Sequence, residues 1–149
     1  DGEYNGIILA AAGLKRLGHE SRITEFLDDG IMLSAVGQGA LGIVCRTGDS
    51  AARHLIEGLD DPPTRTAVTA ERGLLRALGG SCQVPIAGRA GLDAGKLTIK
   101  GLVASLDGTR VVADEITGPP DRAEELGFEL GQKLLSMGAA GILAAILPE

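Results

Sequence analysis

The stretch DPPTRTAVTAERGLLRALGG, residues 61–80, decides the fold of the C-terminal part of this chain. Its first three residues, Asp61-Pro62-Pro63, break the preceding structure. Pro63 suits the first turn of a helix, where a missing N–H has no helical partner to lose. Apolar side chains then recur with roughly helical spacing at Val68, Leu74, Leu75 and Leu78, which predicts a helix over residues 64–78. Gly79-Gly80 ends that helix.

Three candidate strands follow the helix, at residues 84–90, 96–105 and 110–116. Turn signals separate them at Asp93-Ala94-Gly95 and Asp107-Gly108, of which the second is a typical hairpin signal. Gly118-Pro119-Pro120-Asp121 then starts a long helix predicted over 122–136, and a short helix is predicted over 141–147. The sequence therefore predicts an α+β fold: a three-stranded antiparallel sheet packed with helices.

The first 60 residues are expected to be fragments of α/β structure whose sheet partners are absent. The continuous apolar run Gly6–Ala12 predicts a buried strand, and Ile43-Val44-Cys45 predicts another. Short helical turns are expected at 14–17, ending at Gly18, and at 23–27. A helix over 51–59 would be capped by Asp49 or Ser50.

The overall composition excludes several classes of partner. Aromatic residues make up only 2% of the chain, and the net charge is −6. Stacking platforms for single strands and phosphate-binding surfaces are therefore not expected, so no nucleic acid is expected to bind. The nearest approach to a membrane span, Ile142–Leu147, is far too short, so no membrane is expected as a partner.

The N-terminus and the cysteines bear on the origin of the chain. Residues 1–6 contain neither an initiator Met nor a positively charged signal region, so we expect a segment of a longer protein. Two cysteines without a signal peptide point to a reducing, cytoplasmic setting.

The segment Gly37-Gln38-Gly39-Ala40-Leu41-Gly42 fits the G-x-G-x-x-G pattern of dinucleotide-binding proteins. That pattern requires a helix to begin within it, because the helix N-terminus holds the pyrophosphate. The residues that follow, Ile43-Val44-Cys45, favour a strand instead. We therefore interpret the glycines as a hinge or crossover between domains.

Cys82 lies on a tight loop, because two glycines precede it and Pro85 follows it. A thiol on a loop is accessible to a ligand, whereas Cys45 is expected to be a small buried hydrophobic residue. His19 and His54 are not spaced as metal ligands and are expected at the surface, so no metal site is predicted.

Five arginines lie near the glycine-rich or cysteine-bearing segments: Arg16, Arg46, Arg72, Arg76 and Arg89. The planar guanidinium group donates two parallel hydrogen bonds to a carboxylate, so these side chains suit acidic ligands. For any one of them, a solvated surface charge is the simpler interpretation. Without further information the sequence indicates an α+β domain with an accessible thiol.

Three segments in this order and spacing closely resemble the second half of the hydroxymethylbilane synthases, also called porphobilinogen deaminases. They are residues 11–18 (AAGLKRLG), 35–43 (AVGQGALGI), and 70–86, which ends in GGSCQVPI. The Cys-Gln-Val-Pro loop at Cys82 matches the cofactor-attachment signature of that family. The resemblance extends along essentially the whole chain.

The resemblance implies an enzyme that joins four porphobilinogens head to tail, releasing ammonia from each, and then frees linear hydroxymethylbilane by hydrolysis. The growing chain is attached to a dipyrromethane cofactor that is joined by a thioether to the cysteine, here Cys82. Porphobilinogen and linear pyrrole intermediates would be the ligands. Their acetate and propionate groups explain why the cleft needs arginines.

The resemblance also implies roles for individual residues. Arg16 would hold cofactor or substrate carboxylates, and Ala10 would offer a backbone contact to the cofactor. Gln38 and Gly39, where the chain crosses between domains, are also expected to bind the cofactor. Arg46 and Arg72 match family arginines without an assigned role. No segment here resembles the surroundings of the family's catalytic aspartate, so no catalytic residue is expected in this chain.

The implied organisation has three parts: residues 1–34 end the second α/β domain, residues 35–62 cross into the first domain, and residues 63–149 form the third. The complete enzyme is expected to be a monomer, and this chain alone is expected to be inactive without its N-terminal half. Two alternatives remain open: a standalone module that binds a tetrapyrrole precursor or a partner protein without catalysis, and a nucleotide-binding regulator.

Overall fold

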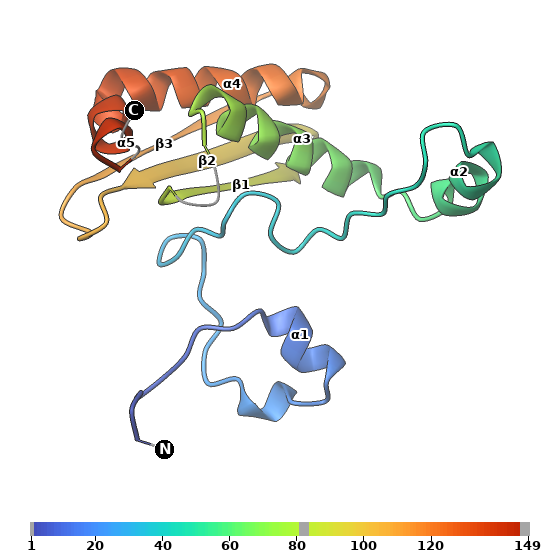
Figure 1. Cartoon of the computed structure of the whole chain (residues 1–149), viewed down its shortest axis with the longest axis horizontal. Helices are drawn as coiled ribbons and strands as arrows, with labels where there is room; N and C mark the ends of the chain where they lie inside the picture. The colour runs from blue at the N-terminus through green and yellow to red at the C-terminus, as the bar shows by residue number, and fades with distance from the viewer. Residues whose placement is uncertain (1, 81–83, 147–149) are drawn as a thin grey trace. The chain divides into compact units, whose positions relative to one another are not determined.

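A three-stranded antiparallel sheet forms the centre of the C-terminal part of the chain (Figure 1). The computed structural model describes residues 2–80 and 84–146. Strands β1 (Ile86–Asp93), β2 (Lys96–Ala104) and β3 (Val111–Gly118) lie in the order β1-β2-β3, so each pairs with its neighbour in sequence. The predicted meander and the α+β class are confirmed.

The two connections of the sheet differ in length. Only Ala94 and Gly95 link β1 to β2, and both have positive φ, as a type I′ hairpin requires. Between β2 and β3, Asp107 organises a longer loop in which its Oδ1 accepts hydrogen bonds from the Ser105 hydroxyl and from the N–H and hydroxyl of Thr109. These hydrogen bonds lower the pKa of Asp107 to about 2, and the bond from Ser105 has the largest effect.

Helix α3 (Pro62–Ala77) confirms the prediction drawn from the opening stretch. Asp61 caps it, because its side chain accepts the Thr64 N–H at 3.0 Å. At the other end Gly79 has a φ of +62°, a conformation that favours glycine, and the helix stops there.

The two C-terminal helices predicted from the sequence are confirmed, and a kink separates them. A short 3₁₀ turn, η2 (Pro120–Arg122), leads into α4 (Ala123–Leu134). Residues Leu135–Ala139 then connect α4 to α5 (Ala140–Ile146). Gly138, with φ +112°, produces the kink between them.

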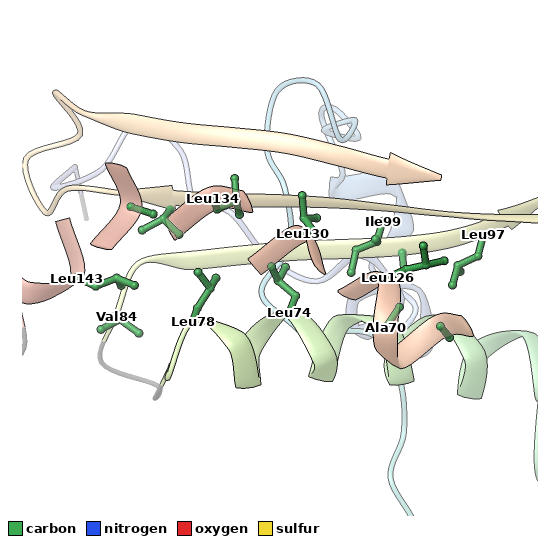
Figure 2. Close-up of a cluster of buried hydrophobic side chains, with 14 of the residues drawn as sticks. Ala70, Leu74, Leu78, Val84, Leu97, Ile99, Leu126, Leu130, Leu134 and Leu143 are labelled. Atoms are coloured by element: carbon green, nitrogen blue, oxygen red, sulfur yellow. The ribbon is translucent and has the colours of Figure 1, made fainter. Parts of the chain in front are cut away.

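Helices α3 and α4 cover the same face of the sheet, and the core lies between them and the strands (Figure 2). Alternate residues of β2 are buried on that face, which is the period expected for a strand with one covered side. The fully buried side chains are mostly aliphatic: Leu74, Leu97, Ile99, Val103, Leu130, Leu134 and Ile142.

Glycines allow α3 and α4 to approach until their backbones touch. A Cβ atom built on Gly127 would overlap the backbone carbonyl of Ala70, and one on Gly73 would overlap that of Glu124. A Cβ on Gly131 would collide with the side chain of Ala77. The pair of helices therefore tolerates no side chain at these positions.

The N-terminal part contains only short helices, which are α1 (Ala11–Arg16), η1 (Glu20–Arg22) and α2 (Ser50–Glu57). The helical turn predicted before Gly18 is confirmed, and so is the cap by Asp49, whose Oδ1 accepts the Ala52 N–H at 2.9 Å. By their internal contacts the residues divide into two units, Asp1–Met32 and Leu33–Glu149.

Three sequence predictions for this part are wrong. Residues 6–12 form no strand, and the side chains of Ile7, Ile8 and Leu9 are exposed. Residues 43–45 form no strand either, so Cys45 is exposed rather than buried. The helical turn expected at 23–27 is absent: the 3₁₀ turn ends at Arg22, and residues 23–27 have no regular structure. A strand needs a neighbour for its backbone hydrogen bonds, and no described strand pairs with either apolar run.

The helix crossing yields a test of the packing. Gly127→Ala should lower the free energy of unfolding by more than about 2 kcal/mol, because the added methyl group meets backbone that cannot move aside without separating the helices. Gly91→Ala is the control: no atom lies within 4 Å of a Cβ built there, and the change should stay within about 0.5 kcal/mol. Urea denaturation of both variants measures the difference, and equal stabilities would refute the crossing.

Candidate functional site

The described residues on both sides of Cys82 are held in the fold. We call residues 81–83 the cysteine loop; Cys82 itself lies outside the described residues. Before it, the Gly80 N–H donates to the Leu75 carbonyl at 3.1 Å, which fixes the chain to the end of α3. After it, Val84 is buried, and the Pro85 carbonyl accepts the Ala104 N–H of β2 at 3.0 Å. The described residues on either side of Cys82 therefore belong to the end of α3 and to the approach to β1.

The glycine-rich segment, defined as residues 35–42, contains a tight turn. The Gln38 N–H donates to the Ala35 carbonyl at 3.1 Å, and the Gln38 side-chain oxygen accepts the Ala35 N–H at 3.3 Å. Gly37 and Gly39 have φ values of +74° and +90°, which explains the glycines on both sides of Gln38. The next helix begins only at Ser50, so no helix N-terminus lies within the motif.

A buried carboxylate joins this segment to the C-terminal domain. Glu71 of α3 is only 7% exposed. Its Oε2 accepts the Gly37 N–H at 2.7 Å, and its Oε1 accepts the Ala90 N–H of β1 at 2.9 Å. Beside this, the Ser34 carbonyl accepts the Gly88 N–H at 3.0 Å. We call the two bonds of Glu71 the Glu71 clamp.

Sequence reasoning missed Glu71, although a signal was present. The residue lies one helical turn from Ala67 and from Leu74, so it falls on the apolar stripe of α3 rather than on the exposed face. A carboxylate on a buried stripe needs donors, because burial without hydrogen bonds is costly. Such a residue predicts a polar contact inside the fold.

Ala10 and Arg16 belong to the N-terminal unit and lie at opposite ends of α1. The Ala10 carbonyl begins the helix by accepting the N–H groups of Gly13 and Leu14 at 3.0 and 3.3 Å. Arg16 is in the last turn, and its side chain is exposed. Its neighbour Lys15 is held by Glu20 at 3.3 Å and lies 5.3 Å from the centre of the Phe26 ring.

The four other candidate arginines belong to the second unit. Arg46, Arg72, Arg76 and Arg89 are all exposed. Arg76 forms an ion pair with Glu124 across the two helices. An exposed guanidinium group can pair with a carboxylate, so the arginines of each unit, taken by themselves, have the chemistry to bind the acetate and propionate groups of a dipyrromethane.

Two further features concern metals and membranes. Within residues 2–80 and 84–146, no cluster of three or more His, Cys, Asp or Glu side chains is arranged to hold a metal ion. His19 and His54 are exposed, as predicted. Across the same residues no helix combines the length and the apolar character needed to cross a membrane.

Comparison with known families decides the relationship. Residues 1–54 match the family model "Porphobilinogen deaminase, dipyromethane cofactor binding domain", and residues 65–136 match "Porphobilinogen deaminase, C-terminal domain". The chain belongs to the porphobilinogen deaminase family. Ala10, Arg16 and the Gln38 turn fall in the first match, whereas Glu71 and Cys82 fall in the second. The dipyrromethane cofactor expected from the sequence agrees with the description of the first model.

Individual porphobilinogen deaminases are similar over almost the whole chain. Identity is 49% to that of Synechococcus sp. (strain RCC307) over 99% of this chain and 47% of the relative. Identity is 48% to that of Syntrophobacter fumaroxidans over 98% of this chain and 47% of the relative. Identity is 49% to that of Pelobacter propionicus over 95% of this chain and 46% of the relative. The chain thus spans about half the length of the curated relatives it matches.

Proposed function

We propose that this chain is part of a porphobilinogen deaminase that joins four porphobilinogens into linear hydroxymethylbilane with release of ammonia, as a transferase of tetrapyrrole biosynthesis in the cytoplasm. One observation carries the proposal: two different parts of the same family match consecutive stretches, 1–54 and 65–136, of a single chain. The alternative of a standalone binding module has no comparable support.

Cys82 is the proposed attachment site of the dipyrromethane. In sequence it lies between the C-terminal end of α3 and the start of β1, whose described residues Gly80 and Pro85 are both hydrogen-bonded. A thiolate is a soft nucleophile that captures the electrophilic carbon left when porphobilinogen loses ammonia. The thioether formed is a poor leaving group. When bound, the cofactor supplies the pyrrole to which each new unit is added.

Arg16 is proposed to hold a carboxylate of the cofactor or substrate. Its side chain is exposed at the end of α1, whereas Lys15 is already paired with Glu20. Ala10, Gln38 and Gly39 are proposed to contribute backbone contacts around the cofactor. The tight turn at Gln38 supports this, since its glycines leave backbone groups uncovered by side chains.

The remaining half of the family's length is proposed to supply the catalytic aspartate and the other wall of the cleft. Ile7, Ile8, Leu9 and Val44 are more than half exposed in this chain, which supports their burial against further protein. We propose that residues 1–34 complete the second domain, residues 35–62 cross into the first, and residues 63–149 form the third. The complete enzyme is proposed to be a monomer.

Replacing Cys82 in the complete enzyme tests the attachment site. Cys82→Ala should abolish the covalent pyrrole adduct, because alanine has no thiol with which to form the thioether. Cys45→Ala is the matched control and should keep the adduct, although Cys45 is exposed. Intact mass spectrometry distinguishes the two. An adduct that survives in Cys82→Ala would exclude the assignment.

Arg16→Leu in the complete enzyme should leave folding intact and weaken cofactor retention or stall elongation. A charged hydrogen bond contributes about 1.5–3 kcal/mol, so turnover should fall by roughly 10- to 100-fold. Arg65→Leu removes another exposed arginine, which pairs with Asp60 at 3.2 Å, and should leave turnover unchanged. The measurements are steady-state turnover and native mass analysis of enzyme-bound intermediates. Normal turnover in folded Arg16→Leu would contradict the role.

The 149-residue chain alone should release no ammonia from porphobilinogen above the blank. A positioned acid or base contributes about 10²–10⁴-fold to such a reaction, and the proposed aspartate belongs to the other half. Oriented binding between the two walls of the cleft would be lost as well. Adding the separately produced N-terminal half should restore activity. Steady turnover by the chain alone would overturn the proposal that the catalytic aspartate lies in the N-terminal half.

A further inference from the structure

We propose that Glu71 is a positioning residue of the deaminase: it holds the turn at Gln38 in a fixed place relative to α3 and β1, the described elements on either side of residues 81–83. The effect on catalysis rests on the function proposed above, whereas the clamp itself does not. Glu71 is the one buried charged side chain among the described residues, and no role follows for it from cofactor attachment or carboxylate binding.

The clamp acts on an edge of the sheet. The Ala104 N–H donates to Pro85, so alternate residues of β1 from Pro85 onward bond to β2, and the N–H groups of Gly88 and Ala90 point away from it. Both outward groups are satisfied: Gly88 donates to the Ser34 carbonyl, and Ala90 donates to Glu71. The incoming segment and the carboxylate therefore cover this edge of β1 where a further strand would otherwise pair.

Both ends of the cysteine loop lie on elements that Glu71 connects. The loop leaves from the end of α3, the helix that carries Glu71, and it returns into β1, which Glu71 holds at Ala90. The other carboxylate oxygen holds Gly37, the residue before Gln38. One side chain thus joins the turn and both supports of the cysteine loop.

The geometry selects a glutamate. The two N–H donors approach different oxygens, at 2.7 and 2.9 Å, so the clamp needs two acceptor atoms. Glutamine has the same length but only one acceptor oxygen, and its NH₂ group would face an N–H. Aspartate keeps both oxygens but is shorter by one methylene group.

Close packing supports the same contact. A Cβ built on Gly88 would lie 3.3 Å from a methyl carbon of Val36 and 2.6 Å from one of Leu74. Val36 therefore lies against β1 beside the clamp, which leaves the segment little room to shift. Val36→Ala loosens this contact without creating an unpaired buried charge.

The first test measures the clamp in the 149-residue chain. In Glu71→Gln, hydrogen exchange at Gly37 or Ala90 should accelerate at least about tenfold, because one of the two bonds is lost. The core amide of Ile99 should keep its rate. Glu124→Gln, which removes an exposed carboxylate paired with Arg76, is the control and should change neither amide. Unchanged exchange at both Gly37 and Ala90 would refute the clamp.

The second test uses the complete deaminase and counts only enzyme loaded with cofactor, as measured by intact mass. In Glu71→Gln, kcat per loaded enzyme should fall about tenfold with KM unchanged. Glu71→Asp should have a kcat between those of Glu71→Gln and the wild-type enzyme. If Glu71 had only a structural role, Glu71→Gln would lower the melting temperature and the fraction of enzyme loaded with cofactor. The kcat per loaded enzyme would then stay at the wild-type value, and that result would overturn the positioning role. If Glu71→Gln does not fold, Val36→Ala replaces it, with a smaller decrease in kcat expected.

The two tests separate the inference from the proposed function. If the wild-type enzyme carried no pyrrole adduct, the proposed function would fail, and the exchange rates at Gly37 and Ala90 would still decide the clamp.

Discussion

The close crossing of α3 and α4 is the contact on which the rest of this structure depends. The two helices meet backbone to backbone at Gly73 and Gly127, which brings both onto the same face of a sheet only three strands wide. At that separation Leu74 and Leu130 reach the strands together and are fully buried. A wider crossing would leave a gap above β2, and a small domain with few aromatic residues has nothing large enough to fill it.

The position of α3 then determines the candidate site. The helix is held by Asp61 at its beginning and by Gly79 at its end, so the cysteine loop starts from a defined place. The same helix carries Glu71 to the edge of β1, where it meets the glycine-rich segment. Packing in the core and geometry at the site are therefore consequences of one helix being placed correctly.

The N-terminal residues show what happens to apolar segments without a sheet. Residues 6–12 and 43–45 have the composition of buried strands, yet they are exposed and unpaired with any described strand. Helix α1 forms nevertheless, because its hydrogen bonds are made within the segment and begin at Ala10. The chain spans about half the length of its relatives, which agrees with apolar segments that find no strand to pair with while a short helix still forms.

Features whose cause is local could be predicted from the sequence alone: the cap and proline at the start of α3, the glycines that end it, and the three strands with their turns. The resemblance carried by the Cys82 loop gave the family correctly, since the order of several motifs is specific. Long-range features could not be predicted. The Glu71 clamp joins residues far apart in the sequence, and Cys45 is exposed in a segment with which no described strand pairs. Helix caps and turns are decided by neighbouring residues, whereas hydrogen bonds across a sheet edge and burial on a sheet exist only once distant segments meet.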